Sequence, residues 1–172
     1  MYSETITLFN RYHSRQGDIW YPHVLHKVDL IVDRASIIAK YGAEVADAAK
    51  LHIKYRKGAN GIEIQGVPYL PHREWENLTN DKLGEYITFS ADANYFDFFV
   101  IGKYVGGEEI VVPDEDTFPD EDFYPSEGIK AINDNDFFDG FYSFMEENAE
   151  CYVITSASNP YKVIPHFELI AR

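Results

Sequence analysis

Alternation of apolar and polar residues predicts short β-strands along most of the chain. In residues 4–9 (ETITLF), Ile6 and Leu8 point to one face and their neighbours to the other, which is the two-residue period of a strand. Residues 19–33 are rich in β-branched and aromatic residues, and Pro22 within them marks a sheet edge or a bulge. We expect further strands within residues 50–55, 62–66, 67–71, 85–90, 95–105, 109–113, 150–158 and 163–171.

A helical period appears in residues 136–147, where apolar residues recur every four positions. The residues on this apolar face are Phe137, Phe138, Phe141, Tyr142 and Met145. The face either packs on the rest of the fold or serves in part as a docking surface for a neighbouring molecule. Asp134 or Asn135 can cap the helix, since short polar side chains accept hydrogen bonds from the first turn. Residues 43–49 form either a short helix or part of a long loop, and residues 72–78 form one or two helical turns.

About seven short strands and one clearly periodic helix indicate a mainly β fold. We expect a small β-barrel or sandwich, with one or two helices as α+β decoration. With 172 residues, of which 45% are apolar, the chain is long enough for one domain with a sizeable core. We therefore expect residues 1–172 to form a single β-rich domain, with the acidic loop and the aromatic helix as an insertion at about 113–148. Trp20 and Trp75 both lie among apolar and aromatic residues and are expected to be structural.

Charge is distributed unevenly along the chain. The formal net charge is −14, and residues 104–161 hold fifteen acidic residues and one basic residue, Lys130, whereas acids and bases balance in the rest. Pro113, Pro119 and Pro125 exclude a regular helix or a central strand from the acidic loop. This loop either is simply solvated, or it attracts basic surfaces and repels nucleic acid. We expect no sequence-specific binding of nucleic acid.

No stretch approaches the roughly 20 apolar residues that span a bilayer. No secretory signal follows Met1. We therefore expect a protein of the bacterial cytoplasm that has no membrane contact. The single cysteine, Cys151, excludes an internal disulfide and is expected to be a small buried apolar residue.

Three histidines near the N-terminus, His13, His23 and His26, raise the question of a metal site. No second ligand pair accompanies them, and His23 and His26, three residues apart in a strand, are expected to point to opposite faces. The acid-rich segments that begin at residues 114, 120 and 134 each have an aromatic residue at the third ligand position of an EF-hand loop. No nucleophile elbow or phosphate-binding loop occurs. We expect no metal, no cofactor and no catalytic residue, and hence a protein that is not an enzyme.

Several motifs resemble those of a family of short structural proteins of tailed phages and prophages, the head-completion, stopper or minor capsid proteins of the neck. The order of seven segments resembles that of the family: TITLFNRY, DIWYPHVLHKVDL, LHIKY, PYLPHREWENL, YITFS, DFFVIGKY and PHFELIAR. The residues that match its motifs are Tyr69, Pro71, Arg73, Glu74, Trp75, Val100, Ile101, Gly102, His166 and Phe167. Residues 114–150 have no counterpart in the family.

The resemblance implies a β-barrel that packs side by side into a ring beneath the portal, seals the filled head and receives the tail. Its partners would be the portal or adaptor ring, the tail components and, on assembly, further copies of itself in the virion neck. An acidic channel lining would repel DNA, or the acidic loop would dock on a basic rim of a neighbouring ring. The residues expected at a partner interface are Asp114, Glu115, Asp116, Asp120, Glu121, Asp122 and Phe141.

Two other functions stay open from the sequence. An acidic, aromatic-rich protein of phage origin could be a DNA mimic that inhibits a host nucleic-acid-binding protein. Mimics spread acids over their whole surface, however, whereas here the acids are confined to one region. The other hypothesis is a hydrolase that uses carboxylates or a metal in residues 114–122.

Overall fold

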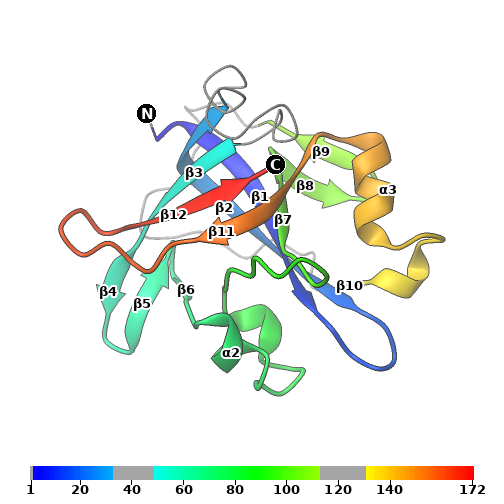
Figure 1. The fold of residues 1–172 in the computed structure, drawn as a ribbon, viewed down its shortest axis with the longest axis horizontal. Helices are drawn as coiled ribbons and strands as arrows, with labels where there is room; N and C mark the ends of the chain where they lie inside the picture. Colours follow the sequence, from blue (N-terminus) through cyan, green and yellow to red (C-terminus); the bar gives the residue numbers. More distant parts are fainter. Residues whose placement is uncertain (1, 33–48, 113–130) are drawn as a thin grey trace.

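The computed structural model describes residues 2–32, 49–112 and 131–172, which form a closed β-barrel with short helices and hairpins around it (Figure 1). Each of the six barrel strands pairs with two neighbours, all pairings are antiparallel, and contact between β1 and β2 closes the ring of strands. Around the barrel the strands are β1 (Glu4–Tyr12), β7 (Phe98–Ile101), β11 (Cys151–Ala157), β12 (His166–Ala171), β3 (Ala49–Lys54) and β2 (Ile19–Val32). The predicted mainly β fold is therefore confirmed, in its barrel form.

Apolar side chains fill the inside of the barrel. Strand β12 shows the pattern most simply, because its residues alternate between half-buried and buried along its whole length. Phe167 and Leu169 of this strand point inward and meet Ile6 and Leu8 of β1, as the alternation predicts. Small barrels are filled by side chains rather than hollow, and these fully buried residues form such a packed core.

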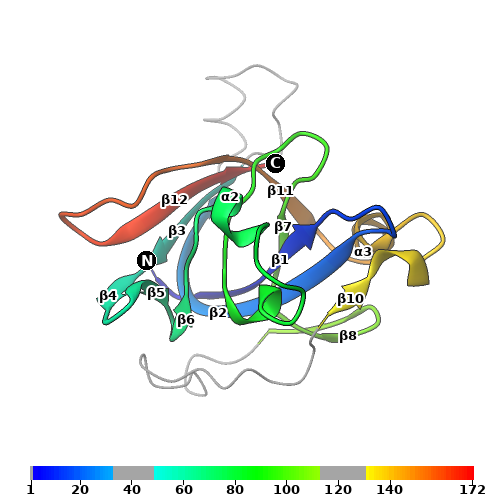
Figure 2. The same cartoon turned by 90° about the horizontal axis from the view of Figure 1, so that it is seen from below.

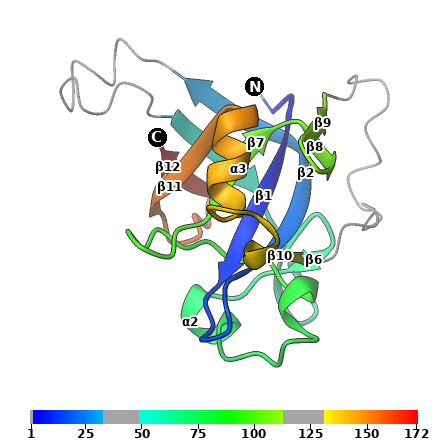
Figure 3. The same cartoon turned by 90° about the vertical axis from the view of Figure 1, so that its right-hand side faces the viewer.

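The outer face of β1 and β7 is covered as well, so residues 5–10 are buried without interruption. Phe9 and Phe98 point outward into a second apolar cluster with Phe141 and Met145. The covering elements are α3 (Phe141–Asn148), β8 (Lys103–Gly106), β9 (Glu109–Val111) and β10 (Ile132–Asn133). Figure 3 looks onto this side, where α3 lies in front of β1 and β7.

A third apolar group closes the end of the barrel that Figure 2 shows from below. Trp75 and Leu83 pack there against Tyr21 of β2, and the Trp75 indole N–H donates a hydrogen bond of 3.0 Å to the Leu83 carbonyl oxygen. The elements at this end are α2 (His72–Trp75), the 3-10 helix η2 (Leu83–Glu85), β4 (Arg56–Gly58), β5 (Gly61–Ile64) and β6 (Val67–Pro68). Both Trp75 and Trp20 are fully buried, which confirms that they are core residues.

Residues 85–90 do not form the strand that the sequence predicts, although Ile87, Thr88 and Phe89 are buried. The side chain of Asn10 takes the place of a neighbouring strand. Its Nδ2 donates a hydrogen bond of 2.7 Å to the Thr88 carbonyl oxygen, and the Thr88 N–H donates one of 3.3 Å to Asn10 Oδ1. A side-chain amide therefore satisfies backbone groups that a strand partner would otherwise satisfy.

The predicted helix over residues 136–147 begins later than expected. A 3-10 helix, η4 (Asp134–Asp136), comes first, and α3 starts only after Gly140, whose φ of 91° lies in the left-handed region that favours glycine. Oδ1 of Asp134 then accepts a hydrogen bond of 2.8 Å from the Phe141 N–H at the start of α3. Asp134 thus caps a helix that begins seven residues further along the chain, rather than the next turn.

Two predicted features, the acidic loop between Pro113 and Pro125 and the helix or loop at residues 43–49 except Ala49, which begins β3, lie outside the described residues. In the part of the chain that the structure describes, no helix is long and apolar enough to cross a membrane.

Candidate functional site

The residues predicted at a partner interface fall into two groups. Those outside the described residues, whose prediction stays untested, are Asp114, Glu115, Asp116, Asp120, Glu121 and Asp122. The remaining residue, Phe141, is fully buried, with its ring centroid 5.2 Å from that of Phe9 and 5.8 Å from that of Tyr104. This burial bears out the alternative in which the apolar helix face packs on the barrel, and it leaves Phe141 no exposed surface for a partner in this structure.

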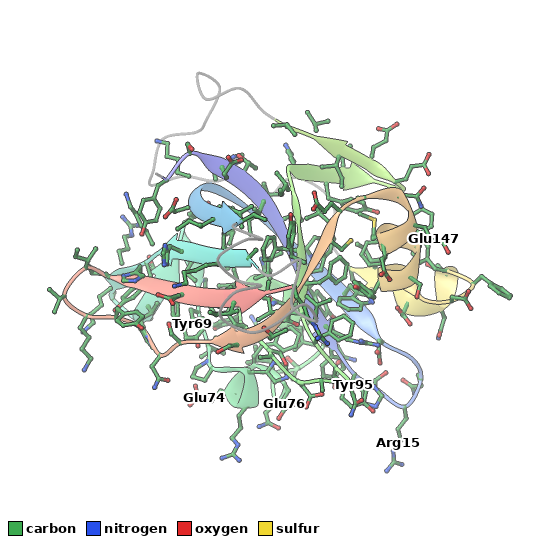
Figure 4. All side chains as sticks on the ribbon, turned by 45° about the horizontal axis from the view of Figure 1, so that its top comes forward. Arg15, Tyr69, Glu74, Glu76, Tyr95 and Glu147 are labelled. Carbon is green, nitrogen blue, oxygen red and sulfur yellow. The ribbon has the colours of Figure 1, made fainter. Side chains whose placement is uncertain are left out.

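The segment between η4 and α3 forms one end of the molecule along its longest axis, at the far right of Figure 1. It carries Phe138, whose side chain is fully exposed instead of lying on the buried helix face, so that part of the helix prediction is wrong. Every charged residue in 133–150 is acidic. Those that are exposed are Asp136, Asp139, Glu146, Glu147 and Glu150, of which Figure 4 labels Glu147 on α3. We call residues 134–150 the acidic end.

The loop of residues 158–165, between β11 and β12, forms the opposite end of the longest axis, as Figures 1 and 2 both show. Its apolar side chains project into solvent: Val163 is 98% exposed and Ile164 is 69% exposed. Tyr55 holds the loop against β3 and β4, because its hydroxyl donates a hydrogen bond of 2.7 Å to the Tyr161 carbonyl oxygen. The exposed basic residues of the loop and of this adjoining chain are Lys54, Arg56, Lys57 and Lys162. We call this surface the basic end.

The two ends are complementary in charge, and both carry exposed apolar side chains. Complementary charges orient two surfaces as they meet and suppress wrong pairings. Because the two surfaces differ and lie at opposite ends of one chain, a contact between them in two copies would be of the head-to-tail kind. Contacts of that kind close into a ring when the rotation from copy to copy closes, and otherwise extend as a filament.

Comparison with known proteins places the chain in a family. The model of one family, described as a family of unknown function (DUF6751), matches residues 1–172. The chain belongs to DUF6751. No curated protein and no solved structure matches it significantly. The description of DUF6751 names no activity and no partner.

The three N-terminal histidines of this DUF6751 chain contact different partners. His13 Nδ1 lies 2.7 Å from an oxygen of Asp18, and His26 Nδ1 lies 3.0 Å from the Thr5 hydroxyl. His23 is buried, and its Nε2 has no hydrogen-bond partner among the described residues. Burial lowers the pKa of His23 to about 4, so this ring is neutral at pH 7. These hydrogen bonds of His13 and His26 therefore go to different residues, and in the part of the chain that the structure describes the three histidines share no common contact.

A buried polar network joins β1 to residues 88–97. The fully buried carboxylate of Asp97 accepts hydrogen bonds from Asn10 Nδ2 at 2.9 Å, from the Arg11 N–H at 2.9 Å and from the Ser90 N–H at 2.8 Å. Burial raises the pKa of Asp97 to about 7, although these three hydrogen bonds act to lower it. Because each contact satisfies a backbone or amide donor, we assign the network a structural role.

The single cysteine is not an activated nucleophile. Cys151 is half-buried on β11, where it pairs with Val100 of β7. Burial, and secondly the charge of Glu146, raise the pKa of the Cys151 thiol to about 12. The thiolate is the reactive form, so a thiol that stays protonated at pH 7 is inert.

Proposed function

We propose that this DUF6751 protein is a structural subunit of the head–tail junction of a tailed phage or prophage, in which copies join head to tail in a ring. The observation that carries the proposal is the pair of opposite ends, one acidic with Phe138 exposed and one basic with Val163 and Ile164 exposed. The resemblance of the sequence to neck proteins supports it, since that resemblance implies a β-barrel and the structure is one.

The strength of one such contact can be judged from its apolar side chains. Burying an exposed Phe, Val or Ile contributes roughly 1.5–3 kcal/mol each, hence about 5–9 kcal/mol for Phe138, Val163 and Ile164 together. Association costs roughly 4–15 kcal/mol in lost freedom of motion. The two ranges overlap, so the contact is weak between free copies and becomes stable when a template such as the portal ring raises the local concentration. We expect a monomer in dilute solution.

The overall charge suits a protein that lines or borders a DNA channel. DNA passing through a neck must not bind to its wall, and a net charge of −14 repels phosphates. In this proposal the acidic residues between 114 and 122 either face the channel or dock on a basic rim of the portal or tail.

Deletion of the gene from the phage or prophage that encodes the chain tests the proposal. We expect DNA-filled heads and free tails to accumulate, and the wild-type gene supplied in trans to restore joined particles. Phe138→Asp and Val163→Asp should fail to restore them, although both side chains are exposed and the variants should melt like the parent. Asn80→Asp adds the same charge at an exposed position near α2 and should restore them. Normal joining without the gene would contradict the proposal.

A capture experiment separates this role from that of a DNA mimic. The immobilised chain should retain portal or tail components from a phage lysate, and no nuclease or DNA-binding protein from a host lysate without phage. Stoichiometric capture of a host nuclease would contradict the proposal and favour a DNA mimic, provided that neutralising the acidic loop abolishes the capture. The residues to change to Asn or Gln are Asp114, Glu115, Asp116, Asp120, Glu121 and Asp122.

A further inference from the structure

One group of side chains on the outer wall of the barrel has the composition of a metal site. Its members are His52, His166 and Glu168, whose ligand atoms all lie within 4.8 Å of one another. No other set of three His, Cys, Asp or Glu side chains within residues 2–32, 49–112 and 131–172 meets this criterion. Strand pairing brings them together, because His52 of β3 lies directly opposite Glu168 of β12, and His166 precedes Glu168 by two residues on the same face.

Hydrogen bonds on the far side of both imidazole rings orient their ligand nitrogens. His52 Nδ1 lies 3.1 Å from Asp29 Oδ2, and His166 Nδ1 lies 2.6 Å from the Ile164 carbonyl oxygen. An ionised carboxylate and a carbonyl only accept hydrogen bonds, so a neutral ring in either place would carry its proton on Nδ1 and offer Nε2 to an ion. Without an ion, His52 Nε2 lies within hydrogen-bond distance of Glu168 Oε2, so an ion would replace that contact. A carboxylate or backbone carbonyl on the other ring nitrogen is the usual arrangement around metal-binding histidines.

The spacing of one pair of ligand atoms fits a tetrahedral ion, and all three atoms lie within 4.8 Å of one another. His52 Nε2 lies 3.4 Å from Glu168 Oε2, and two ligands at tetrahedral Zn²⁺ bond lengths are roughly 3.3–3.4 Å apart. Lys50 Nζ contacts the other carboxylate oxygen, Oε1, at 3.4 Å, which leaves Oε2 directed at the histidine. The Tyr161 ring stacks on His166 with centroids 4.7 Å apart and planes 8° apart, which holds this ring beside His52.

We propose that His52, His166 and Glu168 bind one divalent transition-metal ion of the Zn²⁺ type, with Asp29 as a positioning residue for His52. Two imidazoles and one carboxylate suit Zn²⁺, whereas Mg²⁺ and Ca²⁺ prefer all-oxygen sites. Three protein ligands leave a fourth position for water or for a side chain of a neighbouring molecule. The inference does not rest on the proposed function, but the ion would restrain the basic end, because the Ile164 carbonyl that orients His166 belongs to the loop of residues 158–165.

Calorimetric titration of the purified full chain with ZnCl₂, in buffer that contains millimolar MgCl₂ to occupy carboxylate-only sites, tests the proposal. We expect one Zn²⁺ per chain and a melting temperature that rises with Zn²⁺. His166→Ala and Glu168→Gln should each weaken binding by at least about tenfold, and Asp29→Asn by about tenfold. The matched control is His13→Ala, which removes a histidine that also pairs with a carboxylate but lies outside the group, and it should bind Zn²⁺ like the wild type.

Two results would overturn the proposal. One is a wild-type chain that binds no Zn²⁺ at micromolar concentration. The other is equal binding by the wild type and by Glu168→Gln, a variant of the same shape that keeps both histidines, because the ion would then be held elsewhere. Melting curves recorded with a chelator show that each variant is folded before its affinity is compared.

Discussion

Replacing Asp97 with alanine tests whether the buried network holds residues 88–97 against the barrel. The carboxylate accepts the buried N–H of Ser90 and the part-buried N–H of Arg11, and both donors would lose their partner, whereas Asn10 Nδ2 keeps the Thr88 carbonyl oxygen. An unsatisfied buried donor costs about 1–3 kcal/mol. Two such donors lower the free energy of unfolding by about 2–6 kcal/mol, and we expect about 2–4 kcal/mol because loss of the buried carboxylate offsets part of the cost.

Asp92→Ala is the matched control for this change. The exposed carboxylate of Asp92 also accepts two backbone N–H groups, those of Asn94 and Tyr95, at 2.8 and 2.9 Å. Water can replace it there, so we expect a loss below about 1 kcal/mol. Urea unfolding above pH 7, followed by the fluorescence of the buried tryptophans, gives both values from the shift in midpoint. An Asp97→Ala variant that loses no more stability than Asp92→Ala would refute the reasoning.

Two further predictions concern the core. Trp75→Ala should lower the free energy of unfolding by about 3–5 kcal/mol, since a fully buried indole is removed, and an unchanged urea midpoint would show that the site is not packed as described. Because burial lowers the pKa of His23 to about 4, the unfolded chain takes up a proton first as pH falls below 6.5, and stability should drop by up to about 3 kcal/mol by pH 4. Asp97, with its raised pKa, makes stability rise as pH falls between about pH 7 and 4, which opposes the effect of His23. The free energy of unfolding is therefore measured against pH for both the parent and His23→Leu. Parallel curves would exclude His23 as the cause.

Local alternation was sufficient to predict most strands, because a strand of a small barrel has one face inside and one face outside. The strand expected over residues 95–105 shows where local pattern fails. It is broken at Gly102, whose φ is 106° and where a Cβ would lie 2.5 Å from Ile110 Cγ2 of β9. That close approach depends on a neighbouring strand, so no pattern within residues 95–105 could reveal it. Pro22, in contrast, lies where β2 pairs with β1 alone, as its missing N–H predicts.

The candidate sites were harder to predict than the fold because they depend on which elements meet. His166 and Glu168 alternate in a predicted strand, so their shared face was readable from the sequence, but the pairing that places His52 opposite them was not. Phe138 and Val163 follow helix and strand periods that suggest burial, yet both lie in connecting segments and are exposed. The apolar pattern in the sequence continues beyond the residues at which the helix or strand ends. The exposed side chains on which the proposed function depends lie in these flanking residues.

Disulfide cross-linking within assembled particles tests the head-to-tail arrangement most directly. Phe138→Cys and Val163→Cys in one chain place a thiol at each end, and both positions are exposed. The native Cys151 adds little background, because burial raises its pKa to about 12. We predict that oxidation of particles built from the double variant gives a ladder of covalent multimers, while either single variant gives none. A double variant that assembles into particles but yields no cross-linked species, or single variants that dimerise as readily, would contradict the account.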